Sequence, residues 1–168
     1  MDTDVPQNAP QDRELSARLY GGDREMRIKQ EIVLSIGGYR ALEILGLRPL
    51  VYHMNEGHAA FLGLERARRL METHHLTFLE AQQAASAGLV FTTHTPVPAG
   101  HDIFDAGLFE TYFRDFATGL GVGMPELMAL GSLPAPNGSF NMTTLALQGS
   151  RFHNGVSRIH GGVASVME

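Results

Sequence analysis

A strand, helix, strand pattern constrains the fold of this chain more than any other feature of its sequence. Two short apolar runs, residues 49–54 and 89–93, are of strand type, and the segments 59–72 and 77–87 between them have helical periodicity. Such a βαβ unit builds a parallel sheet through a right-handed crossover, and strands buried in a parallel sheet are expected as unalternated apolar runs. The sequence therefore predicts an α/β fold in which a parallel sheet is flanked by helices.

The regions outside this unit are predicted to add an arm and further helices. Residues 1–22 mix prolines and glycines with polar side chains, which is typical of a loop or arm, and residues 23–168 are predicted to be the folded part. Asp23 is placed to cap a helix whose apolar pattern is interrupted at Gly37 and Gly38. Helices are also predicted over 108–120, 125–130 and 140–150, and residues 154–160 are predicted to be a strand that leads into a final helix.

The composition excludes several classes of protein. The 168 residues are 43% hydrophobic and 18% charged, which is close to the average of folded domains and far from that of disordered chains. The net charge of −5 argues against a nucleic-acid surface, and the short group Arg66, Arg68 and Arg69 is interpreted as a solvated helix face. The sequence has no cysteine, no apolar run of about 18 residues and no secretory signal pattern, so a cytoplasmic protein without disulfides or membrane contact is predicted.

Two polar loops, each directly after a predicted strand, form the candidate site. In open α/β sheets, ligands bind at the carboxyl ends of the strands. The loops cover residues 53–58 and 93–102, and they contain four of the eight histidines together with Asn55, Glu56 and Asp102. So many neutral and acidic hydrogen-bonding groups favour a pocket for a sugar or another polyol.

Other kinds of chemistry fit these loops less well. His53 and His58 are five residues apart, unlike the i, i+4 histidine pair of a helical zinc site. The Gly-x-Ser-x-Gly elbow of serine hydrolases and the glycine spacings of phosphate-binding loops do not occur. Each single histidine would also suit an ordinary hydrogen-bonded position in a loop or core. A His/Glu metal-dependent hydrolase and a non-catalytic carbohydrate-binding remnant remain open as alternatives.

Four ordered stretches of the sequence resemble the α-glucan (glycogen, starch, maltodextrin) phosphorylases, especially their shorter bacterial type. They are LYGGDREMRIKQE (19–31), HMNEGH (53–58), FTTHTPVPAG (91–100) and NGVSRIH (154–160). The resemblance implies that residues 23–168 are a partial Rossmann-like domain from the N-terminal half of a two-domain glycosyltransferase. It also implies an enzyme that transfers a glucosyl unit from an α-1,4-glucan to inorganic phosphate with retention of configuration, this chain supplying the glucan-contacting side of the cleft.

The same resemblance assigns roles to individual residues. His94 matches the histidine beside the transferred glucosyl unit, whose main-chain carbonyl accepts a hydrogen bond from the sugar. Glu56 and His58 lie where the family places an acidic residue and a histidine that contact the glucan, and Asn55 is beside them. Asp23 matches an acidic residue of an active-site loop. Carbonyl dipoles and carboxylates at such positions can stabilise the positive charge of an oxocarbenium-like transition state.

The cofactor half of the family enzyme has no counterpart in this sequence. The family holds pyridoxal phosphate on a lysine of the C-terminal domain, whereas Lys29, the only lysine here, lies in a helical segment and in no matching motif. The resemblance therefore implies that the chain depends on a C-terminal domain and is inactive by itself. Its implied partners are α-1,4-glucan and phosphate, and the oligomeric state stays open, a homo-oligomer included.

Overall fold

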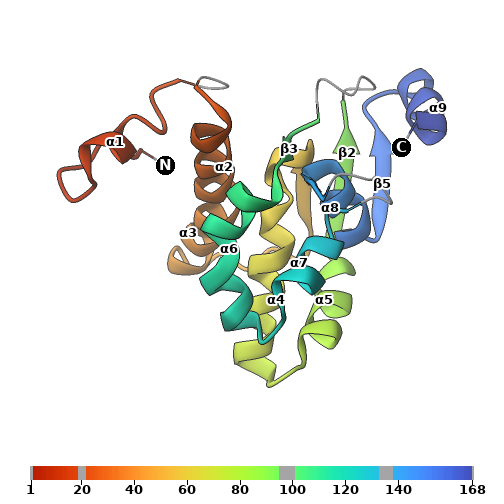
Figure 1. The fold of residues 1–168 in the computed structure, drawn as a ribbon. Coiled ribbons are helices and arrows are strands. Elements are labelled where there is room, and N and C mark those ends of the chain that lie inside the picture. The colour runs from red at the N-terminus through yellow and green to blue at the C-terminus, as the bar shows by residue number, and fades with distance from the viewer. Residues whose placement is uncertain (1, 19–21, 95–100, 133–137, 168) are drawn as a thin grey trace.

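The structure, a computed structural model, describes residues 2–18, 22–94, 101–132 and 138–167 (Figure 1). The strands are β1 (Tyr52–Asn55), β2 (Leu89–Thr93), β3 (Ile103–Phe104), β4 (Phe140–Asn141) and β5 (Phe152–Gly155). The helices are α1 (Pro10–Arg13), α2 (Arg24–Ile32), the π-helix η1 (Val33–Gly37), α3 (Gly38–Ile44), the 3-10 helix η2 (Gly57–Ala59), α4 (Phe61–His74), α5 (Phe78–Ser86), α6 (Ala106–Leu120), α7 (Met124–Ala129), α8 (Met142–Gly149) and α9 (Arg158–Met167).

The main sheet has three parallel strands in the order β1-β2-β5. Met54 of β1 pairs with Phe91 of β2, and Thr92 of β2 pairs with Asn154 of β5. Helices α4 and α5 connect β1 to β2, and α5 begins with the capping box that Thr77 and Glu80 form. The predicted βαβ unit and the predicted α/β fold class are confirmed.

The first strand begins later than the apolar run 49–54 predicts. β1 spans Tyr52–Asn55, and its first ladder hydrogen bond runs from Tyr52 N to Gly88 O at 2.9 Å. Leu50 is 90% exposed. The apolar run is therefore longer than the strand. Only the residues from Tyr52 onward lie beside β2 and pair with it, and the residues before them are left outside the sheet.

The last strand ends earlier than residues 154–160 predict. β5 spans Phe152–Gly155, and α9 begins at Arg158. Ser157 accounts for the early helix, because its hydroxyl accepts a hydrogen bond from the backbone N–H of His160 at 3.2 Å. The segment is therefore strand only in its first two residues.

The helix predicted over 140–150 is also shorter at its start. Phe140 and Asn141 form β4, which pairs antiparallel with β3. The Asn141 side chain then caps α8, accepting hydrogen bonds from the backbone N–H groups of Thr143 at 2.8 Å and Thr144 at 3.2 Å. This cap fixes the N-terminus of α8.

The core is built around stacked phenylalanines. Phe109 and Phe113 of α6 stack with ring centroids 4.5 Å apart, Phe109 lies 3.9 Å from Phe140, and Phe61 of α4 lies 4.5 Å from Phe113. All four are at most 1% exposed. The aromatic stripe of residues 108–116 is thus mainly core, as its helical spacing indicates.

One continuous helical stretch runs from α2 through η1 to α3, and the interruption predicted at Gly37 and Gly38 is wrong. Both glycines have ordinary helical torsions, with φ near −60°. The chain absorbs an irregularity as a π-helical turn over Val33–Gly37. At its start, the Asp23 side chain accepts a hydrogen bond from Met26 N at 2.9 Å, which confirms the predicted cap.

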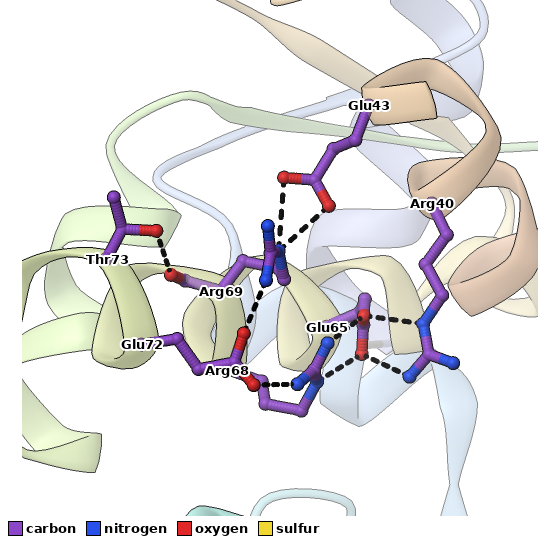
Figure 2. Close-up of polar contacts among 7 residues, drawn as sticks. All are labelled: Arg40, Glu43, Glu65, Arg68, Arg69, Glu72 and Thr73. Atoms are coloured by element: carbon purple, nitrogen blue, oxygen red, sulfur yellow. Dashed lines mark hydrogen bonds and ion pairs between the residues drawn. The ribbon is translucent and has the colours of Figure 1, made fainter. Parts of the chain in front are cut away.

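An ion-pair network joins α3 to α4 (Figure 2). Glu65 is completely buried and pairs at 2.7 Å with both Arg40 and Arg68. Burial raises the pKa of the Glu65 carboxyl, but the hydrogen bonds from the two arginines lower it below its ordinary value overall. The interpretation of the arginine group as a simple solvated face is therefore wrong for Arg68. The outer members of the network are Glu43, Arg69 and Glu72.

The described residues leave one edge of the sheet with apolar side chains in solvent. Phe152 of β5, at the edge of the sheet, is 56% exposed, and Val156 and Ile159 beyond it are 51% and 84% exposed. Exposed apolar patches of this kind favour association.

Within the ranges that the structure describes, no helix is long and apolar enough to cross a bilayer.

Candidate functional site

The two loops predicted to form a site meet at the carboxyl edge of the sheet. Glu56 directly follows β1, and its backbone N–H donates to Thr92 O at 3.0 Å. His94 directly follows β2, and its backbone N–H donates to Glu56 Oε1 at 2.5 Å. The Glu56 carboxylate therefore bridges the ends of the two strands, while Thr95 to Gly100 of the second loop lie outside the described residues.

The backbone at Glu56 is strained. Its torsions, φ 75° and ψ 166°, lie in a region that is almost restricted to glycine. The next residue, Gly57, is buried against α8, where an added Cβ would lie 3.0 Å from the Thr143 nitrogen. The surrounding contacts thus hold the loop in a costly conformation that directs the Glu56 side chain to the neighbouring strand. Strain of this kind clusters at functional sites.

His58 lies two residues after Glu56 and is partly buried. Burial lowers the pKa of the His58 imidazole below its ordinary value, and the nearby Arg27 guanidinium lowers it further, against the opposing effect of Asp102 and Glu56. The imidazole is therefore neutral at pH 7. A neutral imidazole offers one hydrogen-bond donor and one acceptor, which suits a sugar hydroxyl.

Ser35 connects the π-helical turn to this loop. Its hydroxyl lies 2.6 Å from Glu31 O and 3.0 Å from His58 O, and the side chain is 1% exposed. The π-helical turn thus presents a buried hydroxyl that supports the backbone of the candidate site. Sequence analysis does not identify this contact, because it joins segments 23 residues apart.

Replacing Ser35 by alanine is expected to lower the free energy of unfolding by about 1 kcal/mol, because the one hydroxyl proton that the carbonyls of Glu31 and His58 share is lost. Chemical denaturation measures the loss, and the amide resonance of Ala59 reports the change at the loop. Ser165→Ala is the control, since that hydroxyl bonds only to Gly162 O in its own helix. Equal losses in both variants would remove the supporting role of Ser35.

A buried charged cluster lies next to His58. Arg27 of α2 donates two hydrogen bonds to Asp102, from Nε to Oδ1 at 3.1 Å and from Nη2 to Oδ2 at 2.8 Å. Arg27 Nε also lies 3.0 Å from Glu31 Oε1. Glu31 is 1% exposed, and among the described residues its carboxyl oxygens accept no well-aligned hydrogen bond.

The two carboxyl groups of this cluster titrate in opposite directions. Burial and the adjacent Asp102 carboxylate raise the pKa of Glu31 to about 9. Burial also raises the pKa of Asp102, but the hydrogen bonds from Arg27 lower it below its ordinary value overall. At neutral pH the cluster therefore holds a proton on Glu31 and one ion pair between Arg27 and Asp102.

This cluster ties α2 to residues 101 and 102, at the end of the second loop. The Arg27–Asp102 contact spans 75 residues, and Asp102 O accepts a hydrogen bond from Met142 N at 3.0 Å. The neighbouring His101 Nδ1 lies 2.6 Å from Thr143 Oγ1. In the sequence, the spacing of Arg27 and Glu31 indicates an i, i+4 ion pair on one helix face. It gives no indication that Asp102 is the third member of the cluster.

The other predicted residues lie around this centre with fewer contacts. Asn55 is exposed at the end of β1, and its side chain has no hydrogen bond to the described residues. The Asp23 carboxylate is exposed and accepts the capping hydrogen bond from Met26 N. The structure therefore gives Asp23 a local role in α2, and its match to an active-site acid stays a prediction.

His53 belongs to a polar ladder across the sheet. Its Nε2 lies 2.6 Å from Thr92 Oγ1, and that hydroxyl donates to Asn154 Oδ1 at 2.9 Å. Because the Thr92 hydroxyl donates its proton to Asn154 Oδ1, its oxygen can only accept a hydrogen bond from His53. The His53 proton therefore lies on Nε2, which donates to Thr92 Oγ1. Over the described ranges, no group of three or more His, Asp or Glu side chains is placed to hold a metal ion.

Sequence comparisons show that the chain is similar to segments of maltodextrin and glycogen phosphorylases. It is 45% identical over 167 residues to a maltodextrin phosphorylase of Thermococcus litoralis, a match that covers 99% of this chain and 19% of that protein. It is 43% identical over 178 residues to a glycogen phosphorylase of Mycobacterium tuberculosis, of which the match covers 20%. A glycogen phosphorylase of Aquifex aeolicus is 33% identical over 168 residues, 24% of its length. No protein-family model matches the sequence.

The chain thus spans about a fifth to a quarter of the length of these relatives. The match extends over nearly all of its own 168 residues, so the two strand-end loops and the residues of the buried charged cluster lie within the matched segment.

Proposed function

Because this chain matches one segment of the maltodextrin and glycogen phosphorylases over nearly its whole length, we propose that it forms the glucan-contacting side of an α-1,4-glucan phosphorylase cleft. The reaction proposed for the complete enzyme is transfer of a glucosyl unit to inorganic phosphate with retained configuration. Within it, the 168 residues bind and orient the glucan and are not active by themselves.

The observation that carries this proposal is the junction of Glu56, His58 and His94. Glu56 Oε1 is held by the His94 backbone N–H, so the carboxylate is fixed in position. Its other oxygen accepts no hydrogen bond from the described residues and is available to a sugar hydroxyl. A fixed carboxylate and a neutral imidazole at one strand edge can bind a glucan and place negative charge near an oxocarbenium-like centre.

The residues of this chain do not fit the anchoring of pyridoxal phosphate, the cofactor of the family. A lysine that forms a Schiff base needs a lowered pKa. Partial desolvation lowers the pKa of Lys29, but Tyr112 and Asp12 raise it above its ordinary value overall. Lys29 Nζ also lies 3.4 Å from Asp12 and 3.6 Å from Glu25, in ion pairs on the side of α2. No step of the reaction is therefore assigned to a cofactor on this chain.

The alternative of a metal-dependent hydrolase has no support in the described residues. His53 is engaged with Thr92, and the positive charge of Arg27 acts on the His58 imidazole and lowers its pKa. A guanidinium next to the imidazole disfavours a bound cation. The alternative of a non-catalytic carbohydrate-binding remnant uses the same loops, and it differs from the main proposal only in lacking a catalytic partner.

Binding of maltoheptaose to the 168-residue chain tests the proposal. Glu56→Gln is expected to weaken binding roughly 10- to 150-fold, because a charged hydrogen-bond acceptor is lost while the contact with His94 N can remain. His58→Ala is expected to weaken it roughly 3- to 10-fold. Amide chemical shifts during the titration measure the dissociation constant and show which residues respond.

Glu14→Gln is the matched control, since Glu14 is exposed on the N-terminal arm and has no ion pair among the described residues. All variants are checked for an unchanged unfolding temperature. Wild-type affinity in both Glu56→Gln and His58→Ala would assign the two loops to structure and contradict the proposed function.

A further inference from the structure

Glu31 of α2 is linked to both strand-end loops, through one other residue in each case. Its main-chain carbonyl lies 2.6 Å from the Ser35 hydroxyl, which also lies 3.0 Å from His58 O in the first loop. Its side chain lies 3.0 Å from Arg27 Nε, and Arg27 donates two hydrogen bonds to Asp102 at the end of the second loop. Two chains of polar contacts, one to each loop, therefore meet at Glu31.

The start of α8 connects the same two loops directly. Gly57 of the first loop is packed so closely against Thr143 that an added Cβ would lie 3.0 Å from its nitrogen and 3.1 Å from its hydroxyl oxygen. The same hydroxyl lies 2.6 Å from His101 Nδ1, next in the chain to Asp102. A displacement of the end of the second loop is therefore transmitted to Gly57 and to the strained Glu56 before it.

The charge on Glu31 decides how the Arg27 guanidinium is shared. Arg27 Nε lies 3.0 Å from Glu31 Oε1 and 3.1 Å from Asp102 Oδ1. An uncharged Glu31 presents a polar atom to the guanidinium and leaves the ion pair to Asp102. An ionised Glu31 would attract the guanidinium and repel the Asp102 carboxylate, because all three groups are in contact and partly shielded from water.

We propose that Glu31 is a positioning residue for the glucan site, which holds the two strand-end loops in place through Ser35 and Arg27. Glu31 is buried, so it acts through these neighbours and does not touch the sugar. The choice of a glucan as the ligand rests on the proposed function. The coupling of the two loops rests on the contacts alone.

The charged groups around Glu31 predict a pH dependence of glucan binding. Besides burial, the charges that act on its carboxyl are those of Asp102, Arg27 and Arg24, and His58 is close to the first two. The arginines stay positive between pH 7 and pH 9, Asp102 stays ionised, and His58 stays neutral, since the pKa of each of the last two is lowered. Glu31, whose pKa is raised to about 9, is the member of this set that loses its proton as the pH rises.

Amide spectra of the ligand-free 168-residue chain test the coupling. Glu31→Met keeps the length of the side chain but removes its polar atoms, so the amide resonances of Glu56 and His101, one in each loop, are expected to shift. Glu31→Gln keeps the shape and the neutral charge of the acid and is expected to restore both resonances. Glu110→Met is the control, because it makes the same change on a half-exposed side chain of α6.

Binding of maltoheptaose tests the positioning role. At pH 7, Glu31→Met is expected to weaken binding roughly 3- to 10-fold, because the apparent affinity falls with the fraction of molecules whose loops have the binding geometry. Glu31→Gln and Glu110→Met are expected to bind like the wild type. From pH 7 to pH 9 the wild type is expected to lose about 2-fold in affinity, since half of Glu31 is then ionised, whereas Glu31→Gln keeps its affinity.

The positioning role and the proposed function fail separately in these experiments. Wild-type affinity in Glu31→Met, or parallel pH profiles of the wild type and Glu31→Gln, would contradict the positioning role and leave the glucan site intact. If no protein binds maltoheptaose but Glu31→Met shifts the amides of Glu56 and His101, the coupling is supported and the proposed function is contradicted. Should Glu31→Met not fold, the two pH profiles decide alone, because both of those proteins keep a side chain of the native shape.

Discussion

Replacement of Arg27 by methionine is expected to lower the free energy of unfolding by about 3–5 kcal/mol, because it leaves the partly buried Asp102 carboxylate without its partner. Two hydrogen bonds, at 2.8 Å and 3.1 Å, are lost in this variant. Methionine has a similar length and keeps most of the apolar packing of the side chain. The loss therefore reports mainly on the charge. Urea denaturation at pH 7 measures it.

Arg114→Met is the matched control for this prediction. Arg114 forms an i, i+4 ion pair with Glu110 at 2.9 Å, but its side chain is 72% exposed, and such pairs contribute at most about 1 kcal/mol. A double variant, Arg27→Met with Asp102→Asn, is expected to recover part of the loss, since it removes the unpaired charge. Equal destabilisation by Arg27→Met and Arg114→Met would show that the buried cluster carries no special weight.

The same cluster is expected to make folding less favourable as the pH rises, and Glu31→Gln is expected to remove this dependence. The pKa of Glu31 is raised to about 9 by burial and by Asp102, whereas the unfolded chain has the ordinary value near 4.5. Between these values the folded state holds a proton that the unfolded state has released. Stability from this group is therefore complete below pH 4.5 and falls by up to about 1.4 kcal/mol per pH unit towards pH 9.

Urea denaturation of the wild type and of Glu31→Gln at pH 6 and pH 8 measures this effect. The difference between the two proteins is expected to change by about 2–3 kcal/mol over this interval, in favour of the glutamine variant at the higher pH. Glu65→Gln is the contrast, because Arg68 and Arg40 lower the pKa of that equally buried carboxyl overall and its loss is destabilising at neutral pH. A wild type and a Glu31→Gln variant with parallel pH profiles would contradict a protonated Glu31.

The approach of Glu56 and His94 in the candidate site could be predicted from the sequence, because it follows from the geometry of a parallel sheet. The carboxyl ends of parallel strands lie at one edge, so residues directly after 89–93 and after the first apolar run must approach each other. Glu56 and His94 do so, through a hydrogen bond of 2.5 Å. The strained torsions of Glu56 could not be foreseen, since they depend on Gly57 being pressed against α8.

The sequence by itself determined the local features of this protein. The caps at Asp23 and at Thr77 with Glu80, the helical stripe of aromatic residues and the apolar strand runs are encoded within a few residues of each other. A hydrogen bond across three residues closes only a short loop of chain, so its formation depends little on the rest of the molecule. The order of the βαβ unit could likewise be predicted, because each of its segments shows its own periodicity within a few residues.

Only the tertiary structure decided which charged and polar groups lie inside. The Arg27–Asp102 pair closes a loop of 75 residues, and the Ser35 hydroxyl reaches the His58 carbonyl across 23. Burial and the neighbouring charges, not the residue type, set the proton on Glu31. A carboxyl group is the same in every sequence, but its protonation depends on the dielectric and the charges that the folded chain places around it.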